Sequence, residues 1–528
     1  MSYLASIREL SADAEPLERL YQWAVQAGEA GAFAEAVNTL QAETPDNLLF
    51  AAWRYRLAYA AGQVKERAIA WAWVIPLAVL NGLLLWLLSQ DRFSVQVNDA
   101  NVMPGVFLAA GPVSAVFIIL YLALAGAGRW RRLAVLAAGI VALTLYAYLL
   151  YPGMIPFAFQ TQYVTLASIH LPLAAITAIG LYLLWRQRTA DDRFAFLIKC
   201  LEVIILGGLF GIALGIFTAI TFALFEALRI SPPDLVVRLF VAGGGGLIPV
   251  LAVAILYDPR QPPGQQSFGE GLSKLIAMLM RILLAPTVLV LLIYLAFIPF
   301  NFRQPFQNRD VLITYNIMLF AVMALLAGAT PVREAEPGGR VQRWLRWGVI
   351  AAAILALVVG IYAFAAIAYR TAIDKWTPNR IAFMGWNLIN IGILTLLLLR
   401  QARGARDGWM ERLRATFATA MIPYAVWSIA VLILLPWLSR PNPQTIQSLP
   451  PSIREIAYEQ APPILLKCAG SPHIYLLEDG KKRWVKDIPT FQAQGYTWDD
   501  VELTSCADLR TLTDGRPIPP DAGAPPQP

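Results

Sequence analysis

Eleven apolar runs, each of about 20 residues, lie between positions 69 and 438, and they constrain the fold more than any other feature. A run of this length, wound as a helix, crosses the roughly 30 Å hydrocarbon core of a bilayer. The runs lack the alternation of a membrane β-barrel, and lipid demands internal backbone hydrogen bonds, so helices are predicted. The expected spans cover 69–88, 105–125, 133–151, 163–185, 197–225, 236–256, 275–297, 310–328, 347–369, 380–399 and 417–437.

The distribution of charge separates a membrane part from two soluble flanks. Charged residues make up about 22% of each flank but only about 11% of positions 69–438. We therefore expect an all-α polytopic membrane protein with about eleven transmembrane helices, a small helical N-terminal region and a small α+β C-terminal domain. The expected parts are a cytoplasmic helical region (1–66), a transmembrane domain (67–438), a Pro-rich linker without regular structure (439–463), a hairpin-containing domain (464–519) and a disordered tail (520–528).

Positive charge in the loops predicts the orientation. One alternating set of loops holds 18 Lys and Arg residues and the other holds 8. Because positively charged loops stay in the cytoplasm, the N-terminus is expected there, and an odd number of spans places the C-terminus outside. The first apolar run begins too late for a cleavable signal, so the first span is expected to be retained. The predicted location is the plasma (inner) membrane, with the lipid bilayer as an obligatory partner.

Several classes of function are disfavoured by composition. The net charge of +7 comes from short loops between apolar runs, without a basic face on a soluble domain, so nucleic-acid binding is not expected. The only two histidines are His170 and His473, which argues against a histidine-based zinc site or a Ser-His-Asp triad. A phosphate-cradling Gly-rich loop and paired intramembrane carboxylates are also missing from the sequence. We expect a protein that is not an enzyme and has no cofactor or metal.

Two of the three cysteines lie in the C-terminal flank, which is predicted to face an oxidising compartment. A disulfide between Cys468 and Cys506 is favoured there, and closing this loop contributes about 3–4 kcal/mol in the chain-entropy model. The alternative is a pair of free thiols in a reduced domain. Cys200 lies near the start of a span.

The N-terminal flank shows helical periodicity. Apolar residues repeat at helix spacing from Leu17 to Leu40, and the segment from Gly31 to Asn47 looks like part of a tetratricopeptide unit. Such units need neighbours to bury their faces. Two interpretations stay open: a hairpin that binds a cytoplasmic protein partner through 1–66, or a short helical cap on the membrane domain.

The C-terminal flank contains a hairpin motif. Apolar and polar residues alternate on both sides of Asp479–Gly480, and the sequence FQAQGYTWDDV follows at 491–501. Positions 464–519 resemble a small repeat unit of bacterial surface and secreted proteins, in which a hairpin precedes F-x-x-x-G-Y-x-W-x-D-V. The resemblance implies an extracytoplasmic location and contact with a cell-wall or surface partner.

A loop between two apolar runs carries a second motif. It runs from Arg370–Thr371 to Thr377–Pro378–Asn379–Arg380, with an arginine at each end. The motif resembles the signature of an uncharacterised bacterial multi-pass membrane family, domain of unknown function 4153, in which an Arg precedes T-x-N-R at this spacing. The spans before it, which include Pro286 and Tyr294, extend the likeness over about 190–440. Lys375–Trp376 replaces the family's usual Y-G, and the resemblance implies no activity.

The chemistry of this loop permits two arrangements. Thr377 is a good N-cap and Pro378 suits the first helical position, so a span is predicted to start here. Arg380 in the first turn opposes the helix dipole and needs a negative partner. Asp374 is the favoured partner. In the alternative, Arg370, Thr377, Asn379 and Arg380 form an anion site for a lipid headgroup or carboxylate.

Polar residues inside the apolar runs are further candidates, because they are costly in lipid. Asn387 and Asn390 share a face, and interhelical hydrogen bonding is the favoured interpretation. His170 is expected to be a hydrogen-bonded packing residue rather than part of a proton path. Glu202 and Arg281 lie at comparable depths: they either pair or, as slightly favoured, extend separately to the interface.

Glycines mark two of the spans. Gly207, Gly211 and Gly215 place a small residue at every fourth position, which predicts close approach of another helix. Gly243–Gly246 followed by Pro249 is compatible with a broken sixth span, a device of transporters, although a flexible helix is the commoner outcome. Two functional hypotheses follow: a non-enzymatic membrane scaffold or sensor that displays an extracytoplasmic module, or a transporter or lipid/anion carrier that uses the Arg370/Arg380 loop and a broken sixth span.

Overall fold

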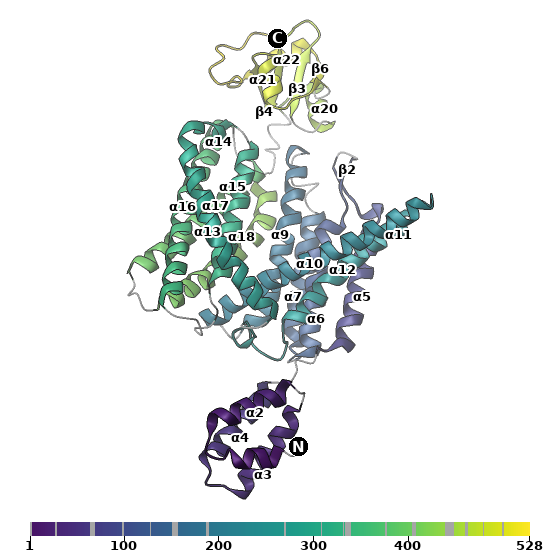
Figure 1. Cartoon of the computed structure of the whole chain (residues 1–528). Helices are drawn as coiled ribbons and strands as arrows, with labels where there is room; N and C mark the ends of the chain where they lie inside the picture. Colours follow the sequence, from purple (N-terminus) through teal and green to yellow (C-terminus); the bar gives the residue numbers. More distant parts are fainter. Residues whose placement is uncertain are drawn as a thin grey trace. The chain divides into compact units, whose positions relative to one another are not determined.

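A computed structural model describes most of the chain (Figure 1). At the borders of several gaps, Asp374 included, only the backbone is described. The residues outside the description are 1–2, 27–28, 64–68, 98–99, 127, 150–156, 186–188, 269–270, 308, 331, 333–338, 375–376, 404–407, 439–447, 460–462, 479 and 499–500.

The N-terminal residues form a separate helical unit, Met1–Ala70, with a core of its own. Its helices are α1 (Tyr3–Glu9), α2 (Ala14–Gln26), α3 (Ala30–Glu43) and α4 (Leu48–Gln63). The apolar positions repeat at helix spacing, so one stripe of each helix turns inward and buries Phe33, Leu40 and Trp53. Asn47 begins α4 by accepting hydrogen bonds from the backbone N–H groups of Leu49 and Phe50. The predicted helical region is confirmed.

Ten helical segments of the described chain are long and apolar enough to cross a membrane, and the chain is therefore a multi-pass membrane protein. α15 adds a shorter apolar stretch, Ile313–Ala329, so a helix lies at each of the eleven predicted runs. The helices are α5 (Trp71–Leu88), α6 (Val106–Ala125), α7 (Trp130–Leu149), α9 (Phe157–Leu184), α10 (Ala190–Ala227), α11 (Asp234–Arg238), the π-helix η2 (Leu239–Gly243), α12 (Gly244–Leu256), α13 (Gly271–Phe297), α14 (Gln304–Gln307), α15 (Arg309–Ala329), α16 (Gly339–Asp374), α17 (Pro378–Arg403) and α18 (Trp409–Leu438). Three 3₁₀ turns, η1 (Asp91–Phe93), η3 (Pro263–Gln265) and η4 (Ile298–Asn301), lie between them.

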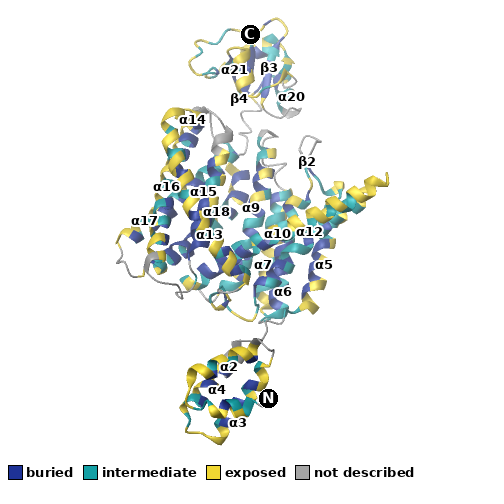
Figure 2. Cartoon of the chain, viewed as in Figure 1, coloured by how far each residue is buried: buried dark blue, intermediate teal, exposed yellow. Residues whose placement is uncertain are grey.

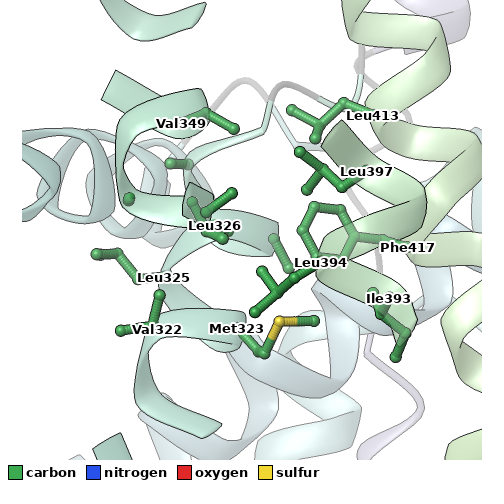
Figure 3. Close-up of a cluster of buried hydrophobic side chains, with 14 of the residues drawn as sticks. Val322, Met323, Leu325, Leu326, Val349, Ile393, Leu394, Leu397, Leu413 and Phe417 are labelled. Atoms are coloured by element: carbon green, nitrogen blue, oxygen red, sulfur yellow. The ribbon is translucent and has the colours of Figure 1, made fainter. Parts of the chain in front are cut away.

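The membrane helices pack around two main cores. One core lies among α10, α13, α15, α16, α17 and α18; Figure 3 shows Leu394 of α17 between Met323 of α15 and Phe417 of α18. The other core lies among α6, α7, α9, α17 and α18. α17 and α18 contribute to both cores, and α18 packs on α9 as well as on α10. These two helices therefore join the two halves of the bundle.

The outward faces of the membrane helices are exposed and apolar (Figure 2). On α13, for example, Leu289, Val290 and Ile293 are exposed. A helix that is apolar all round is typical of a membrane span, because lipid takes the place of a packed neighbour. The exposed surface thus agrees with a hydrocarbon environment around the bundle.

A short two-stranded sheet connects α5 to α6, which the sequence analysis did not predict. Strands β1 (Val95–Val97) and β2 (Ala100–Met103) pair in antiparallel fashion. The carbonyl oxygen of Phe93 lies 1.9 Å from where a Cβ on Gly105 would stand. Only glycine fits at that position, which closes the connection against the start of α6.

The C-terminal module contains a five-stranded sheet in the order β6-β3-β4-β5-β7. Its elements are α20 (Pro451–Glu459), β3 (Ile464–Cys468), β4 (Ile474–Glu478), β5 (Lys481–Val485), α21 (Ile488–Ala493), β6 (Val501–Thr504), α22 (Cys506–Thr511) and β7 (Thr513–Asp514). β3–β4 and β4–β5 are antiparallel, whereas β3–β6 and β5–β7 are parallel. The predicted hairpin is β4–β5, and Gly480 takes the positive φ of its turn (72°); Asp479 lies outside the described residues.

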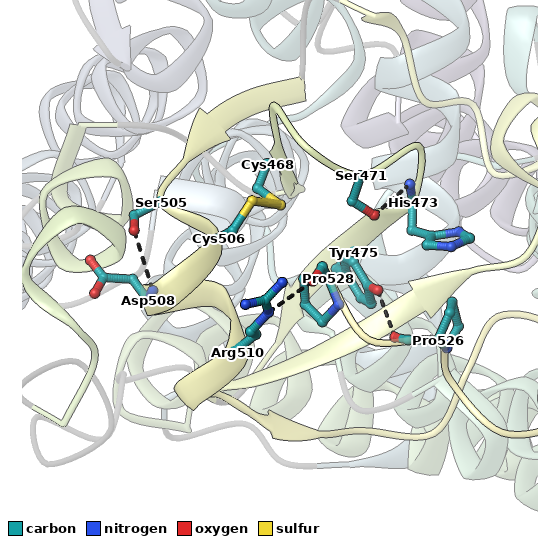
Figure 4. Close-up of a disulfide and its surroundings, with 10 residues drawn as sticks. All are labelled: Cys468, Ser471, His473, Tyr475, Ser505, Cys506, Asp508, Arg510, Pro526 and Pro528. Atoms are coloured by element: carbon teal, nitrogen blue, oxygen red, sulfur yellow. Dashed lines mark hydrogen bonds between the residues drawn. A yellow bond between two sulfur atoms is a disulfide. The ribbon is translucent and has the colours of Figure 1, made fainter.

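A disulfide joins Cys468 to Cys506, as predicted (Figure 4). It links the end of β3 to the first residue of α22, over a sequence separation of 38. The side chain of Ser505 caps α22 by accepting a hydrogen bond from the N–H of Asp508. The disulfide ties α22 to the sheet, and the cap fixes where the helix begins.

Two expectations for this flank are wrong. The segment 439–463 was expected to lack regular structure, but it contains α20, whose amphipathic pattern buries Ile453 in the module's core. The tail 520–528 was expected to be disordered, but it packs on the module: the carbonyl of Pro526 accepts a hydrogen bond from Tyr475 and that of Pro528 accepts one from Arg510. In both cases long-range contacts outweigh the local signal of the prolines.

Candidate functional site

The four residues of the predicted anion site line one cavity. This pocket has a volume of about 260 Å³ and lies among α9, α15, α16 and the start of α17. We call it the arginine pocket. Its lining residues are Gln162, Ile313, Asn316, Ile367, Arg370, Thr377, Asn379, Arg380 and Phe383. Arg370, Thr377, Asn379 and Arg380 thus come together, and none of the described lining residues is acidic.

The local sequence explains how the pocket is shaped. Thr377 caps α17, since its hydroxyl oxygen accepts a hydrogen bond from the N–H of Arg380, 3.3 Å away. Pro378 occupies the first helical position, where its missing N–H has no cost. The predicted helix start is confirmed. The positive end of the α17 dipole therefore lies in the region that Arg370 and Arg380 also line.

Arg380 finds a negative partner on the neighbouring helix. Its guanidinium Nη1 donates a hydrogen bond to the backbone carbonyl of Arg370, 3.3 Å away, in the last turns of α16. The C-terminal end of a helix carries partial negative charge, so α16 offsets the unfavourable position of Arg380 in the first turn of α17. The side chain of Asp374, which was the favoured partner, lies outside the described residues.

Amides continue the polar lining into the bundle. The Oδ1 of Asn316 on α15 accepts a hydrogen bond of 2.8 Å from Nδ2 of Asn387 on α17, and both side chains are buried. Asn390, one turn further, accepts a 2.5 Å hydrogen bond from the hydroxyl of Tyr424 on α18. The predicted interhelical role of Asn387 and Asn390 is confirmed. In the pocket wall, Oε1 of Gln162 is buried without a hydrogen-bond partner among the described residues.

His170 is a buried packing residue, as expected. Its Nε2 accepts a hydrogen bond from the indole Nε1 of Trp386, 3.0 Å away, and its Nδ1 lies 2.7 Å from the carbonyl of Leu166. Both ring nitrogens are therefore used within the helix bundle. The neutral tautomer with its proton on Nδ1 satisfies both bonds.

Glu202 and Arg281 do not pair, and the expected extension of Glu202 to the interface is wrong. Glu202 is buried and its carboxylate accepts a 2.8 Å hydrogen bond from the ammonium group of Lys199, one turn earlier on α10. Lys199 also donates to the carbonyl of Ser267, 2.7 Å away, and lies over the ring of Phe268. Arg281 instead donates to the carbonyl of Ala329 at 3.4 Å. A local partner three residues away satisfies Glu202 at a smaller entropic cost than one on another helix.

The sixth span is continuous rather than broken. It runs from α11 through the π-helix η2 into α12 without leaving helical geometry. The glycines serve packing, because a Cβ on Gly246 would lie 2.7 Å from the Cα of Gly82 on α5. The π-turn places one extra residue just before this contact. The small residues allow two backbones to touch, and the helix does not need to unwind.

The glycine stripe on α10 makes no close contact within the described chain. Nothing lies within 4 Å of the position of a Cβ on Gly211 or Gly215, and Gly207 has only an ordinary contact with Ile248. Within the described chain, no other helix makes the expected close approach to this part of α10. The neighbouring Ile212 and Ile216 are likewise exposed.

Several polar residues of the bundle were missed by the sequence analysis. Lys199 falls within the predicted span 197–225, and its i, i+3 spacing to Glu202 is a signal of pairing. Asn81 on α5 donates hydrogen bonds to Ser114 on α6 and to the carbonyl of Gly246 on α12. An isolated asparagine within an apolar run is such a signal too. The sequence gives no signal that distinguishes Gln162 and Asn316 from residues that make ordinary interhelical contacts.

Among the described residues, no three His, Cys, Asp or Glu side chains group in a way that could hold a metal ion. Comparison of the chain with protein-family models, with curated proteins and with solved structures finds no match. The resemblances of the Arg370–Arg380 motif and of the C-terminal repeat therefore stay predictions.

Proposed function

We propose that the protein is a non-enzymatic membrane protein that binds an oxyanion, a phosphate or carboxylate group, in the arginine pocket. One observation carries the proposal: Arg370, Thr377, Asn379 and Arg380 line one cavity together with amide side chains. A lipid/anion carrier is the corresponding cellular role.

The chemistry of the lining matches an oxyanion. Guanidinium groups present planar, fixed donors to phosphate and carboxylate oxygens. The helix dipole of α17 favours negative charge at the same place. Asn316, Asn379 and Gln162 add amide groups around the charged end. Ile313, Ile367 and Phe383 supply apolar walls, which reduce screening by water.

The site is tested by ligand-dependent thermal unfolding of the full chain in lipid nanodiscs. In nanodiscs of uncharged lipid, inorganic phosphate is expected to raise the unfolding temperature, whereas chloride at equal ionic strength is not. If the natural anion is a lipid headgroup, nanodiscs with phosphatidylglycerol give the larger shift. The two arms separate a free anion from a headgroup.

Variants identify the pocket as the place of binding. Arg380→Gln removes a charge-assisted contact, and we expect roughly a tenfold to a hundredfold loss of affinity. Arg303→Gln is the matched control, since Arg303 is exposed and does not line the pocket. An equal loss in both variants, or an identical stabilisation in wild type and Arg380→Gln, contradicts the proposal.

The orientation is part of the same proposal. The excess of positive charge in one set of loops supports a cytoplasmic N-terminus and an extracytoplasmic C-terminal module in a bacterial plasma membrane. The disulfide of the module supports an oxidising compartment on that side. The arginine pocket, formed where α16 ends and α17 begins, then faces the extracytoplasmic side.

A second candidate function is a scaffold or sensor. The observation in its favour is that both flanks have hydrophobic cores of their own. Trp23 and Tyr55 on the N-terminal unit and Trp498 on the C-terminal module are exposed, as in surfaces that bind partners. A cytoplasmic protein on the first unit and a cell-wall or surface partner on the second are the expected ligands. Full-length protein that captures neither type of partner in cross-linked cells contradicts this role.

A further inference from the structure

A second and larger cavity lies in the other half of the membrane domain. It has a volume of about 510 Å³, within the range of small-molecule sites, and lies among α5, α6, α9, α10 and α12. None of the residues that line it lines the arginine pocket. Apolar side chains form most of its wall, which also includes the polar side chains of Ser114 and Lys199.

The cavity opens on the surface of the bundle that faces lipid. Phe107 on α6, Ile204 on α10 and Val241 on η2 all line it, and they are 59%, 58% and 60% exposed, respectively. A hydrocarbon chain can therefore enter sideways from the bilayer without crossing an aqueous phase. This opening sets the cavity apart from an enclosed packing defect.

The charge in the wall favours an uncharged occupant. Lys199 is the charged residue among the described lining residues, and Glu202 holds its ammonium in a buried ion pair. The carbonyl of Ser267 takes another of its donors. A ligand carboxylate or phosphate would have to compete with Glu202 for Lys199 in a medium of low dielectric.

A small polar spot lies halfway along the spans. Ser114 accepts a hydrogen bond from Asn81, so the hydrogen of its own hydroxyl is not used by that contact. The carbonyl of Gly245 lacks its intrahelical donor, because Pro249 has no N–H. Oδ1 of Asn81 is buried without a described partner. One donor and two acceptors thus lie in or behind an apolar wall at the level of the bilayer centre.

We infer that this cavity binds a long-chain, uncharged lipid with a single hydroxyl or carbonyl oxygen. The chain fills the apolar part at mid-membrane. A hydroxyl oxygen accepts a hydrogen bond from Ser114 and donates one to the carbonyl of Gly245, whereas a carbonyl oxygen only accepts from Ser114. The class includes long-chain alcohols and carbonyl-bearing apolar chains. The inference is independent of the oxyanion proposal, since it uses another cavity.

A photo-crosslinking experiment on the full chain tests the inference. The probe is hexadecanol with a diazirine in its chain, added to the protein in nanodiscs. Mass spectrometry is expected to find the crosslinks on α6, α9 and α12. Crosslinks that are spread over the exposed face of α13, with no enrichment at the cavity, overturn the inference.

Competition separates the chemistry of possible occupants. Unlabelled hexadecanol is expected to reduce labelling at the cavity at least fivefold more than hexadecane, which lacks the oxygen, and than hexadecanoate, which is charged. Equal competition by hexadecane would show that the ligand oxygen makes no contribution at Ser114 and Gly245, and it overturns the inference. Stronger competition by hexadecanoate shows an anionic occupant and overturns the inference.

Two matched glycine variants locate the site. Gly245 lines the cavity, and nothing lies within 4 Å of the position of its Cβ, so a side chain can begin there and Gly245→Phe is expected to fill the cavity. Gly211→Phe on α10 also meets nothing within 4 Å, but it lies outside the cavity. We expect Gly245→Phe alone to abolish labelling. Equal labelling in the two variants contradicts the inference, and the crosslink map of the wild type tests it even if a variant does not fold.

Discussion

The indole Nε1 of Trp386 on α17 donates a hydrogen bond to Nε2 of His170 on α9, across 3.0 Å. Both side chains are buried, and their sequence separation is 216 residues. The bond links α17, which contributes to both cores of the membrane domain, to α9, which contributes to the second core. A polar pair of this kind in lipid has few alternative partners, so it contributes to the choice of helix neighbours.

Removal of this donor should destabilise the membrane domain. Trp386→Phe leaves Nε2 of His170 buried without its partner, at a cost of about 1–2 kcal/mol in the free energy of unfolding. Trp437→Phe is the matched control, because the bond from Trp437 to Tyr146 is exposed. Chemical unfolding in detergent micelles measures the free energy of unfolding of both variants. Equal effects of the two variants contradict a special role for the buried pair.

The ion pair between Lys199 and Glu202 makes a sharper prediction. Lys199→Met leaves a buried carboxylate without its cation, and we expect a loss of about 3–5 kcal/mol. The double variant Lys199→Met/Glu202→Leu removes both charges and should recover most of this loss. Arg281→Met should cost less than Lys199→Met, because Arg281 is not the partner of Glu202. Unfolding that is most sensitive to Arg281 would contradict this assignment and favour a pair between Glu202 and Arg281.

The membrane fold was largely predictable, and its polar contacts were predictable only in part. Hydrophobic runs set the spans because each must be about 20 residues long in lipid. The residues of the arginine pocket could be named as an alternative to an Arg380–Asp374 pair, because Thr377–Pro378 marks a helix start and Arg380 conflicts with the dipole there. The partner of Glu202 was missed because depth in the membrane does not identify neighbours. The lone asparagines did not reveal their partners for the same reason.

The helix cap at the arginine pocket can be tested by itself. Thr377→Ala removes the oxygen that accepts from the N–H of Arg380, and a loss of about 1 kcal/mol in the free energy of unfolding is expected. Thr377→Ser keeps this oxygen and should retain most of the stability. Hydrogen exchange of the first turn of α17 is the local readout. Similar exchange in both variants would show that the hydroxyl is not the cap.

Acid should loosen α21 in the C-terminal module. Hydrogen bonds from the side chain and then the backbone N–H of Thr490 hold the pKa of Asp487 below its ordinary value. The folded-state pKa is thus the lower one, so the stabilising effect is complete above the ordinary pKa and is lost as the pH falls through the lowered pKa. Asp487→Asn keeps an N-cap that does not titrate, and it should reduce this pH dependence.

Hydrogen exchange in α21, corrected for the intrinsic effect of pH, measures the change. Asp521→Asn serves as a control, since Asp521 is exposed and caps no helix. A wild-type pH profile that coincides with that of Asp487→Asn contradicts the assignment.

Reduction of the disulfide should unfold the C-terminal module at lower denaturant. The bond between Cys468 and Cys506 closes a long loop, and its loss is expected to cost about 3–4 kcal/mol. Pulse proteolysis of the full chain in urea, with and without dithiothreitol, measures the effect. Cys468→Ser should behave like the reduced protein, whereas Cys200→Ser should keep the response to dithiothreitol. A reductant-insensitive wild type contradicts the prediction.

The prolines of the C-terminal flank and the glycines of α10 show where sequence patterns mislead. Proline near Ile453 indicates an irregular chain, yet the apolar face of α20 finds a core that lies later in the sequence. Gly211 and Gly215 have the spacing of a helix contact, but a partner helix is a property of the whole bundle. In both cases the decisive contacts are non-local.

The number of membrane crossings is the central claim, and α15 decides it. With α15 the chain crosses eleven times and its ends face opposite sides; with the ten longer spans alone they face the same side. Protease treatment of sealed right-side-out and inverted vesicles, with an epitope at each end, is the most direct measurement. We predict that the C-terminal epitope is cleaved only in right-side-out vesicles and the N-terminal epitope only in inverted ones. Cleavage of both epitopes in the same vesicles would contradict it.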